Sequence, residues 1–353
     1  MEEKLLRLRV EKIVVETNDT KTFYLQNIDN QRIGYEAGQF LTLIFDFKGR
    51  EVRRSYSLSS SPDTDGELLT ITIKRVANGE ISRLLYDFAV VGDTYICMPP
   101  MGRFTLPKLR RARHYFMVAA GSGIVPIWGL MKTVLATEPT SRVTLIYQTT
   151  NAANAIFYPK IEKMRDDTEG SKNLEVQYFF SRPTETHVAP QHLTKDILQT
   201  LVRQKLKNGR RQAEFYLCGP TLFMKVATMA LHMNDIRDAH IHREDFVVPL
   251  EKPPSATELT DFGHPTQATI HLGGKIFDVE VPFRTTILDA ALAQKVPMPY
   301  SCKGGVCTSC LCQLTSGKVK MPSNEKLLDD EILRGLVLSC LAYADSEFVE
   351  IQV

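Results

Sequence analysis

Apolar and polar positions alternate in short runs over the first part of the chain. Four of these runs are rich in β-branched and aromatic residues: Leu6–Val15, Gln39–Phe47, Glu51–Ser59 and Leu68–Arg75. Turn-forming stretches separate them, among them Asn27–Asn30 and Ser61–Gly66. Many short strands with few helical patterns are typical of a small antiparallel barrel. We therefore expect a β-barrel domain over residues 1–106.

Longer apolar runs replace this alternation beyond residue 107. His114–Ala120 is apolar at almost every position, as in a strand that is covered on both faces. Gly121-Ser122-Gly123 follows, and Val125–Leu135 has a helical pattern. Strands and helices then alternate, with strands at Arg142–Tyr147, Leu174–Phe180 and Glu214–Leu217 and helices at Ile156–Arg165 and Thr221–Met233. This order predicts an α/β domain with a doubly wound parallel sheet over residues 107–247.

Residues 248–265 carry four prolines and show no apolar periodicity, which is typical of a linker. After them, Ala268–Leu272 and Lys275–Val281 flank Gly273-Gly274, the pattern of a two-residue hairpin. Thr286–Gln294 fits a short amphipathic helix. We therefore expect a third, α+β domain over residues 266–353.

Composition narrows the class of protein. Of the 353 residues 43% are hydrophobic and 24% charged, as in packed globular domains. The formal net charge is only +2, without a long basic run, so nucleic acid is a poor candidate for a partner. We find no secretion signal and no apolar stretch of about 18 residues or more, so we expect a cytoplasmic protein without a membrane span.

Four of the seven cysteines carry the strongest chemical signal. Cys302, Cys307 and Cys310 are spaced C-x4-C-x2-C, and Cys340 follows, which is the plant-type spacing for a [2Fe–2S] cluster. Gly304 and Gly305 allow the backbone to approach such a cluster closely. The alternative is a structural zinc site, which usually pairs two short cysteine knuckles. Cys97 and Cys312 are expected to be packed thiols and not ligands.

Residues 267–353 resemble a plant-type ferredoxin domain, with the same order of hairpin, helix and Tyr300-Ser301-Cys302. The resemblance implies a β-grasp fold and one-electron transfer through the cluster.

A second motif lies in the predicted barrel. Arg54-Ser55-Tyr56-Ser57 matches the R-x-Y-S motif of the ferredoxin–NADP reductase superfamily, and Gly38-Gln39-Phe40 matches a segment upstream of it. The resemblance implies that Tyr56 packs on the flavin ring, Ser57 approaches the flavin N5 and Arg54 pairs with a phosphate. Leu58 continues this strand, and we include it among the flavin-binding residues.

Downstream residues complete the flavin motif. Ile73 and Arg75 fit the family's next strand, and Gly79-Glu80-Ile81-Ser82 resembles its G-x-x-S helix start. In this resemblance the backbone N–H groups of Gly79 and Ile81, with Ser82 as the N-cap, bind a pyrophosphate, which implies FAD and not FMN.

The α/β domain carries nucleotide motifs of the same superfamily. Gly121-Ser122-Gly123-Ile124 stands between a buried strand and a helix, where an anionic pyrophosphate can bind. Cys218-Gly219-Pro220 matches the C-G-P motif beside the nicotinamide, and Glu244 and Phe246 resemble the segment at the flavin edge. Ser181 and Arg182 correspond to a pair that contacts the 2′-phosphate, so we expect NADPH to be preferred, with NADH possible.

The order barrel, nicotinamide domain and ferredoxin resembles the reductase components of multicomponent oxygenases, of which the phenylacetyl-CoA epoxidase type is nearest. It implies an NAD(P)H oxidoreductase that passes electrons through FAD and [2Fe–2S] to a protein such as a di-iron oxygenase. The acceptor is alternatively a fatty-acyl desaturase or another hydroxylase. Other classes are a non-catalytic iron–sulfur carrier or sensor and a zinc-stapled interaction module; a nitric-oxide dioxygenase would need an N-terminal globin.

Overall fold

The computed structural model describes residues 5–29, 31–108, 112–167, 173–184, 189–206, 213–246, 265–324, 326–327 and 329–353. They fall into two compact units, Leu6–Phe246 and a second unit that contains residues 265–353. The predicted linker over residues 248–265 lies outside the described residues except for Pro265.

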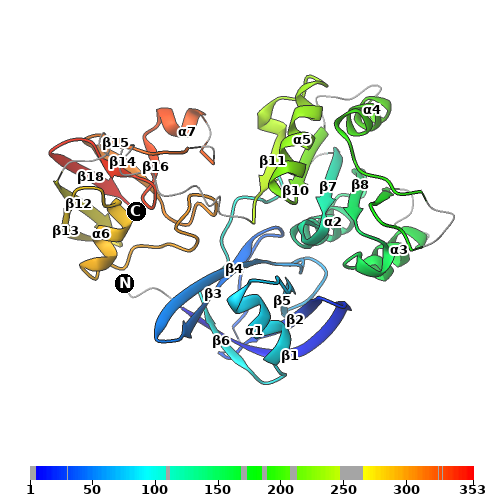
Figure 1. Ribbon diagram of the computed structural model, residues 1–353, viewed down its shortest axis with the longest axis horizontal. Coiled ribbons are helices and arrows are strands. Elements are labelled where there is room, and N and C mark those ends of the chain that lie inside the picture. Colours follow the sequence, from blue (N-terminus) through cyan, green and yellow to red (C-terminus); the bar gives the residue numbers. More distant parts are fainter. Residues whose placement is uncertain are drawn as a thin grey trace. The chain divides into compact units, whose positions relative to one another are not determined.

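The first part of the larger unit is an antiparallel barrel (Figure 1). Its strands are β1 (Leu6–Thr17), β2 (Thr20–Asn27), β3 (Phe40–Phe47), β4 (Arg50–Ser57), β5 (Leu69–Lys74) and β6 (Thr94–Cys97), in the order β4-β3-β6-β1-β2-β5. A bridge between Leu58 and Ile71 joins the two ends of this sheet. Helix α1 (Glu80–Phe88) inserts Ile81 and Leu85 into the barrel core. The predicted barrel is confirmed.

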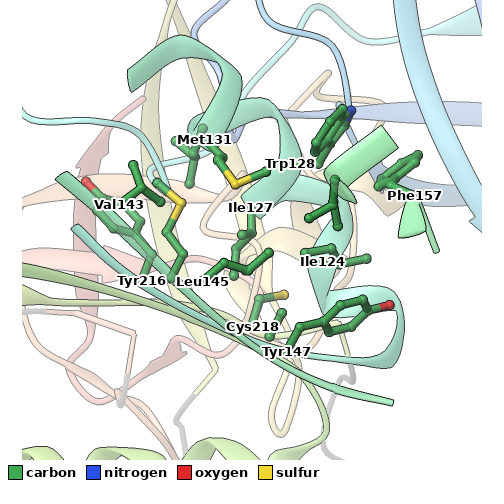
Figure 2. Packing of buried hydrophobic residues seen from close by; sticks show 14 of the residues in the cluster. Ile124, Ile127, Trp128, Met131, Val143, Leu145, Tyr147, Phe157, Tyr216 and Cys218 are labelled. Carbon is green, nitrogen blue, oxygen red and sulfur yellow. The ribbon is translucent and has the colours of Figure 1, made fainter. Parts of the chain in front are cut away.

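The second part is a parallel five-stranded sheet between two layers of helices. The strands are β7 (His114–Ala120), β8 (Arg142–Thr149), β9 (Leu174–Phe180), β10 (Ala213–Cys218) and β11 (Ile241–Glu244), in the order β11-β10-β7-β8-β9. The helices are α2 (Ile124–Thr137), α3 (Tyr158–Asp166), α4 (Lys195–Lys205) and α5 (Thr221–His232). Alternate residues of β7 pack into different clusters: Met117 faces α2 and α3, and Val118 faces α4 and α5. Figure 2 shows the cluster under α2. The predicted doubly wound sheet is confirmed.

The chain reverses its direction across this sheet between β7 and β10. It runs from β7 outward to β9, then returns to β10 on the other side of β7. In open α/β sheets a ligand binds at this switch point, beyond the carboxyl ends of the strands. The two loops that follow β7 and β10 therefore mark the place where a ligand is expected.

The barrel and the parallel sheet are joined by polar contacts within one unit. The Tyr216 hydroxyl donates to the carbonyl of Thr105 (2.9 Å), and Ser61 hydrogen-bonds to Thr133 on α2 (2.7 Å). Lys132 of α2 pairs with Asp65. A Cβ on Gly129 would lie 2.9 Å from the Ser60 carbonyl oxygen, so α2 packs directly on the chain that follows β4.

Among its described residues, the second unit combines a mixed five-stranded sheet with two short helices and a two-stranded sheet. It contains β12 (Thr266–Leu272), β13 (Lys275–Val281), α6 (Ile287–Ala293), β14 (Leu311–Ser316), β15 (Val319–Lys320), α7 (Asp329–Leu333), β16 (Leu336–Leu338), β17 (Tyr343–Ala344) and β18 (Phe348–Gln352). The main sheet has the order β13-β12-β18-β14-β16, with β12 and β18 parallel, and the two-stranded sheet is β15-β17. Thr286 caps α6 by accepting the Asp289 N–H (3.1 Å). This is the expected β-grasp arrangement.

None of the helices among the described residues is long and apolar enough to cross a membrane.

Candidate flavin, nucleotide and iron–sulfur sites

The Gly121–Gly123 loop turns tightly at the end of β7. Gly121 has a positive φ of 55°, a conformation that favours glycine. A Cβ on Gly123 would lie 2.0 Å from the Cys218 carbonyl oxygen, so this position is closed to any side chain. Helix α2 begins at Ile124, directly after the loop, without an acidic residue in its first turn. Its N-terminus therefore favours an anion.

The Cys218–Pro220 loop lies against this first loop. Cys218 is fully buried at the end of β10, and its register partners are Ala119 of β7 and Glu244 of β11. A Cβ on Gly219 would lie 3.0 Å from the Cβ of Ala120, and α5 begins directly after Pro220. The structure thus brings Gly121–Gly123, Cys218 and Glu244 to one edge of the sheet, at the switch point.

Phe246 and the Ser181-Arg182 pair lie at the same edge, farther out. Phe246 follows β11 and is 44% exposed. The N–H groups of Ser181 and Arg182 donate to the carbonyls of Thr149 (3.0 Å) and Thr150 (2.8 Å), which fixes the chain beyond β9 against the end of β8. The Arg182 side chain is exposed, as a residue that meets a phosphate from solvent has to be.

Strand β4 presents the R-x-Y-S motif, and exposure falls from Arg54 and Ser55 to Ser57. Arg54 and Tyr56 are two residues apart and so share one face of the strand, whereas Ser57 is buried. Burial raises the pKa of Tyr56, which keeps this ring neutral. The Arg54 guanidinium donates to the carbonyl of its neighbour Arg53 (2.9 Å) and remains at the surface. Leu58 is fully buried and belongs to the barrel core.

Helix α1 begins differently from the prediction. Gly79 takes the N-cap position and the helix starts at Glu80, so the prediction that Ser82 is the N-cap is wrong. The Ser82 hydroxyl accepts the N–H of Val76 (3.3 Å), because the serine lies in the first turn and folds back over Gly79. A Cβ at Gly79 would lie 2.3 Å from the Ser82 oxygen, so a side chain there would displace this hydroxyl from Val76.

The other predicted residues near α1 have structural contacts of their own. Ile73 and Ile81 are buried in the barrel core, so only their backbone groups are left to meet a ligand. Arg75 pairs with Asp87 (2.9 Å). Arg50 pairs with Glu80 (2.9 Å), which places the first turn of α1 beside the start of β4.

The four predicted cluster ligands form two pairs of thiols. The Sγ atoms of Cys310 and Cys340 are 3.1 Å apart. Cys307 Sγ accepts the N–H of Cys302 (3.5 Å), and a hydrogen bond from the Cys302 thiol lowers the pKa of Cys307. The loop is tight: a Cβ on Gly305 would lie 2.3 Å from a methyl carbon of Leu341. Backbone N–H groups that point at sulfur stabilise thiolates.

Two pairs of thiols fit two bridged irons better than a single zinc ion. Cys312 is buried within the sheet, where its thiol lies 3.7 Å from the Val337 carbonyl oxygen. The donor set and its geometry therefore fit a [2Fe–2S] cluster, and Cys312 is a packed thiol.

Comparison with known families assigns each domain. Residues 7–106 match an oxidoreductase FAD-binding domain, residues 117–228 an oxidoreductase NAD-binding domain, and residues 270–345 a 2Fe-2S iron-sulfur cluster binding domain. The chain is 34% identical to a component of the 1,2-phenylacetyl-CoA epoxidase of Escherichia coli (strain K12), over 95% of this chain and 94% of that protein. It belongs to the family of three-domain FAD and [2Fe–2S] reductases.

Other relatives and solved structures extend the comparison. The reductase is 31% identical to the ferredoxin reductase component of 3-ketosteroid-9-alpha-monooxygenase from Mycobacterium tuberculosis, over 98% of this chain and 95% of that protein. Its fold is similar to phthalate dioxygenase reductase, at a TM-score of 0.59 over 100% of this chain and 99% of that chain. It is also similar to a type IV self-sufficient cytochrome P450 monooxygenase, at a TM-score of 0.74 over 99% of this chain and 41% of the longer one.

The reductase is an NAD(P)H oxidoreductase with FAD and a [2Fe–2S] cluster, so the predicted enzyme class and cofactors are confirmed. FAD accepts a hydride and releases single electrons, and the cluster carries one electron at a time.

Sequence reasoning missed Gly129, which sets how closely α2 packs on the barrel. The available signal was a glycine in the middle of an apolar helix, which indicates a close packing contact.

Proposed function

We propose that the reductase supplies electrons from NAD(P)H, by way of FAD and the [2Fe–2S] cluster, to a partner oxygenase of the phenylacetyl-CoA epoxidase type. The observation that carries this proposal is the match to the phenylacetyl-CoA epoxidase component, because it extends over all three domains and 95% of the chain. A carrier or sensor without a hydride route is disfavoured, since its flavin and nucleotide domains would have no role.

In this proposal, separate groups of residues bind FAD, the nucleotide and the cluster. Arg54 and the first turn of α1 hold the FAD phosphates, and Tyr56 packs on the flavin ring with Ser57 near its reactive edge. Gly121–Gly123 with Ile124 holds the nucleotide pyrophosphate at the start of α2. Cys218, Gly219 and Pro220 line the nicotinamide position, with Glu244 and Phe246 beside it. Cys302, Cys307, Cys310 and Cys340 hold the cluster.

NADPH is the favoured donor in this proposal. Ser181 and Arg182 lie at the carboxyl edge of β9, and an exposed guanidinium suits a dianionic 2′-phosphate. Replacing Arg182 by Ala tests this point: the KM for NADPH should rise about tenfold, while the KM for NADH changes less than twofold. An equal change for both nucleotides would contradict the preference.

A second candidate acceptor is a 3-ketosteroid-9-alpha-monooxygenase. The specific observation in its favour is the match at 31% identity to that enzyme's reductase component over 98% of this chain.

The acceptor is identified by reconstitution. The purified reductase is mixed with NADPH and either a phenylacetyl-CoA epoxidase or a 3-ketosteroid monooxygenase, and NADPH consumption is compared with substrate oxidised. Coupled turnover with the epoxidase alone supports the proposal. Coupled turnover with the steroid enzyme alone would identify that enzyme as the acceptor instead. If NADPH reduced neither the flavin nor the cluster, the proposed electron route would be refuted.

We also propose a reducing compartment such as the cytoplasm, because ligation of the cluster requires reduced cysteines and the buried Cys97 and Cys312 are thiols.

A further inference from the structure

Tyr147 connects the Gly121–Gly123 loop, here called the nucleotide loop, to the core of the parallel sheet. It lies near the end of β8, opposite Ala119 of β7, and its side chain is fully buried. Its hydroxyl donates to the carbonyl of Gly121 (3.1 Å) and accepts the N–H of Ile156 (3.1 Å). Figure 2 shows the ring beside Ile124 and Cys218, at the edge of the apolar cluster.

The hydroxyl is not needed to fill this space. The ring packs in the apolar cluster under α2 and lies near the ring of Tyr178, and a phenylalanine would supply the same packing. Burying a hydroxyl costs free energy unless it is hydrogen-bonded. The presence of tyrosine here, instead of phenylalanine, is therefore explained by the groups that its hydroxyl bonds. Burial also raises the pKa of Tyr147, so the group stays protonated and able to donate.

The bond to Gly121 fixes the direction of a peptide group in the nucleotide loop. The Gly121 carbonyl oxygen accepts from the Tyr147 hydroxyl and from the N–H of Ile124. A peptide unit is planar and trans, so a carbonyl that is held inward turns the following N–H, that of Ser122, to the opposite side. Gly121 has a positive φ and no side chain, and nothing lies within 4 Å of where a Cβ would be, so local packing at Gly121 provides no such restraint.

We propose that Tyr147 is a positioning residue for the nucleotide: its hydroxyl orients the Gly121–Ser122 peptide so that the Ser122 N–H faces the pyrophosphate of NAD(P)H. The inference rests on the proposed role of the Gly121–Gly123 loop. Through Ile156, the same hydroxyl joins that loop to the chain just before α3.

The test is Tyr147→Phe, which removes one oxygen and keeps the ring. Tyr178→Phe is the matched control, since Tyr178 is the register partner of Tyr147 on β9 and donates its hydroxyl to Glu162 (3.0 Å), away from the loop. Both variants are made in the full chain with FAD and cluster loaded. The Kd of NADP⁺, and the KM and kcat of flavin reduction by NADPH, are measured for each.

The Kd and KM of Tyr147→Phe should rise about fivefold, the effect of one neutral hydrogen bond, with kcat at saturating NADPH within twofold of wild type. Tyr178→Phe should leave the Kd unchanged. An unchanged Kd in Tyr147→Phe, or an equal rise in both variants, would overturn the inference. Wild-type protein that fails to bind NADP⁺ would refute the proposed nucleotide site itself.

Hydrogen exchange on the wild-type protein gives a test that does not depend on the variant folding. NADP⁺ should slow exchange at the Ile156 amide as well as at residues 121–124, because that amide donates to the same hydroxyl. Protection of the loop without any change at Ile156 would show that Tyr147 does not couple the two segments.

Discussion

Gly123 and Cys218 meet at the point where the parallel sheet reverses its strand order. A Cβ on Gly123 would lie 2.0 Å from the carbonyl oxygen of Cys218 and 2.4 Å from its carbonyl carbon. Both are backbone atoms, held in register between β7 and β11. The two loops therefore pack backbone to backbone at the switch point, and no side chain fits between them at Gly123.

Gly123→Ala should separate these loops. Since the Cys218 backbone is held by strand pairing on both sides, we expect a loss of about 1–3 kcal/mol in unfolding free energy and a weaker affinity for NADP⁺. Chemical unfolding and nucleotide titration measure the two effects. Gly34→Ala is the control, because a Cβ there meets nothing within 4 Å. Equal behaviour of the two variants would contradict the close-packing argument.

Cys307→Ser should remove the one-electron route and spare the hydride route. The serine hydroxyl cannot replace the thiolate that pairs with Cys302, so the cluster is lost. We expect NADPH to reduce the flavin at the wild-type rate, while reduction of a cytochrome-type acceptor is abolished. Cys312→Ser, which changes a thiol two residues from Cys310, should keep both activities. A Cys307→Ser variant that reduces the acceptor normally would place the cluster off the route.

The sequence predicted the elements whose pattern is strong on its own. Leu174–Phe180 is a strand with the predicted bounds, and the Gly273-Gly274 turn joins β12 to β13 as expected. The helix over Lys195–Lys205 was not predicted, although Ile197, Leu198, Leu201 and Val202 have the spacing of an amphipathic helix. Packing of Leu198 and Val202 against α5 stabilises it, and that contact is not visible in local sequence.

In the candidate sites, too, features that depend on tertiary contacts could not be predicted from the sequence. The spacing of the four cysteines predicted a common cluster, but their division into two pairs follows from tertiary structure. The G-x-x-S motif predicted Ser82 as the N-cap of α1, but the backbone of the structure places Gly79 in that position. Tyr147 gave no signal at all, because a buried tyrosine in a strand has the same pattern whether or not its hydroxyl holds a loop.

Arg54→Ala should weaken FAD retention. Arg54 is exposed on the same face of β4 as Tyr56, where a cation can meet a phosphate. We expect at least a roughly tenfold rise in the Kd of FAD, measured by fluorescence on reconstituting the apoprotein. Arg9→Ala removes a guanidinium of the same barrel that is paired with Glu11 instead, and should have no effect. Purification of Arg54→Ala with full flavin content would argue against the assigned role.

His114 should make stability depend on pH. Burial lowers its pKa from 6.5 to about 4, with Arg142 and Lys205 adding to the effect and Glu175 opposing it. Between pH 4 and 6.5 the unfolded chain therefore binds a proton that the folded chain does not, so this group lowers stability as pH falls through that window. Above pH 6.5 the effect vanishes.

His114→Gln should flatten this dependence, since glutamine stays neutral and can still bond the Thr144 hydroxyl, which lies 2.8 Å from the imidazole Nε2. The wild-type protein should lose about 1–2 kcal/mol more than the variant between about pH 7 and pH 4, allowing for solvent screening. Urea unfolding at a series of pH values measures the difference. Parallel curves for the two proteins would show that His114 does not titrate as expected.

The ion pair between Lys132 and Asp65 should help to set the geometry of hydride transfer. Lys132 lies on α2, the helix that follows the nucleotide loop. Asp65 lies in the segment that follows β4, and β4 carries the R-x-Y-S motif. The Lys132 side chain is only 11% exposed and lies over the ring of Trp128. Burial lowers the pKa of Lys132, so the cation is retained here because Asp65 compensates its desolvation.

Lys132→Met keeps the apolar stem and removes the charge. We expect flavin reduction at saturating NADPH to slow about tenfold, because α2 and the barrel no longer hold one orientation and a small displacement of the reacting atoms is costly. Asp65→Asn should have a similar effect, and the double variant should be no worse than either single one, since both remove the same contact. Additive losses in the double variant would show that each residue acts separately. A combined loss equal to one single loss identifies the pair as the unit that aligns nucleotide and flavin.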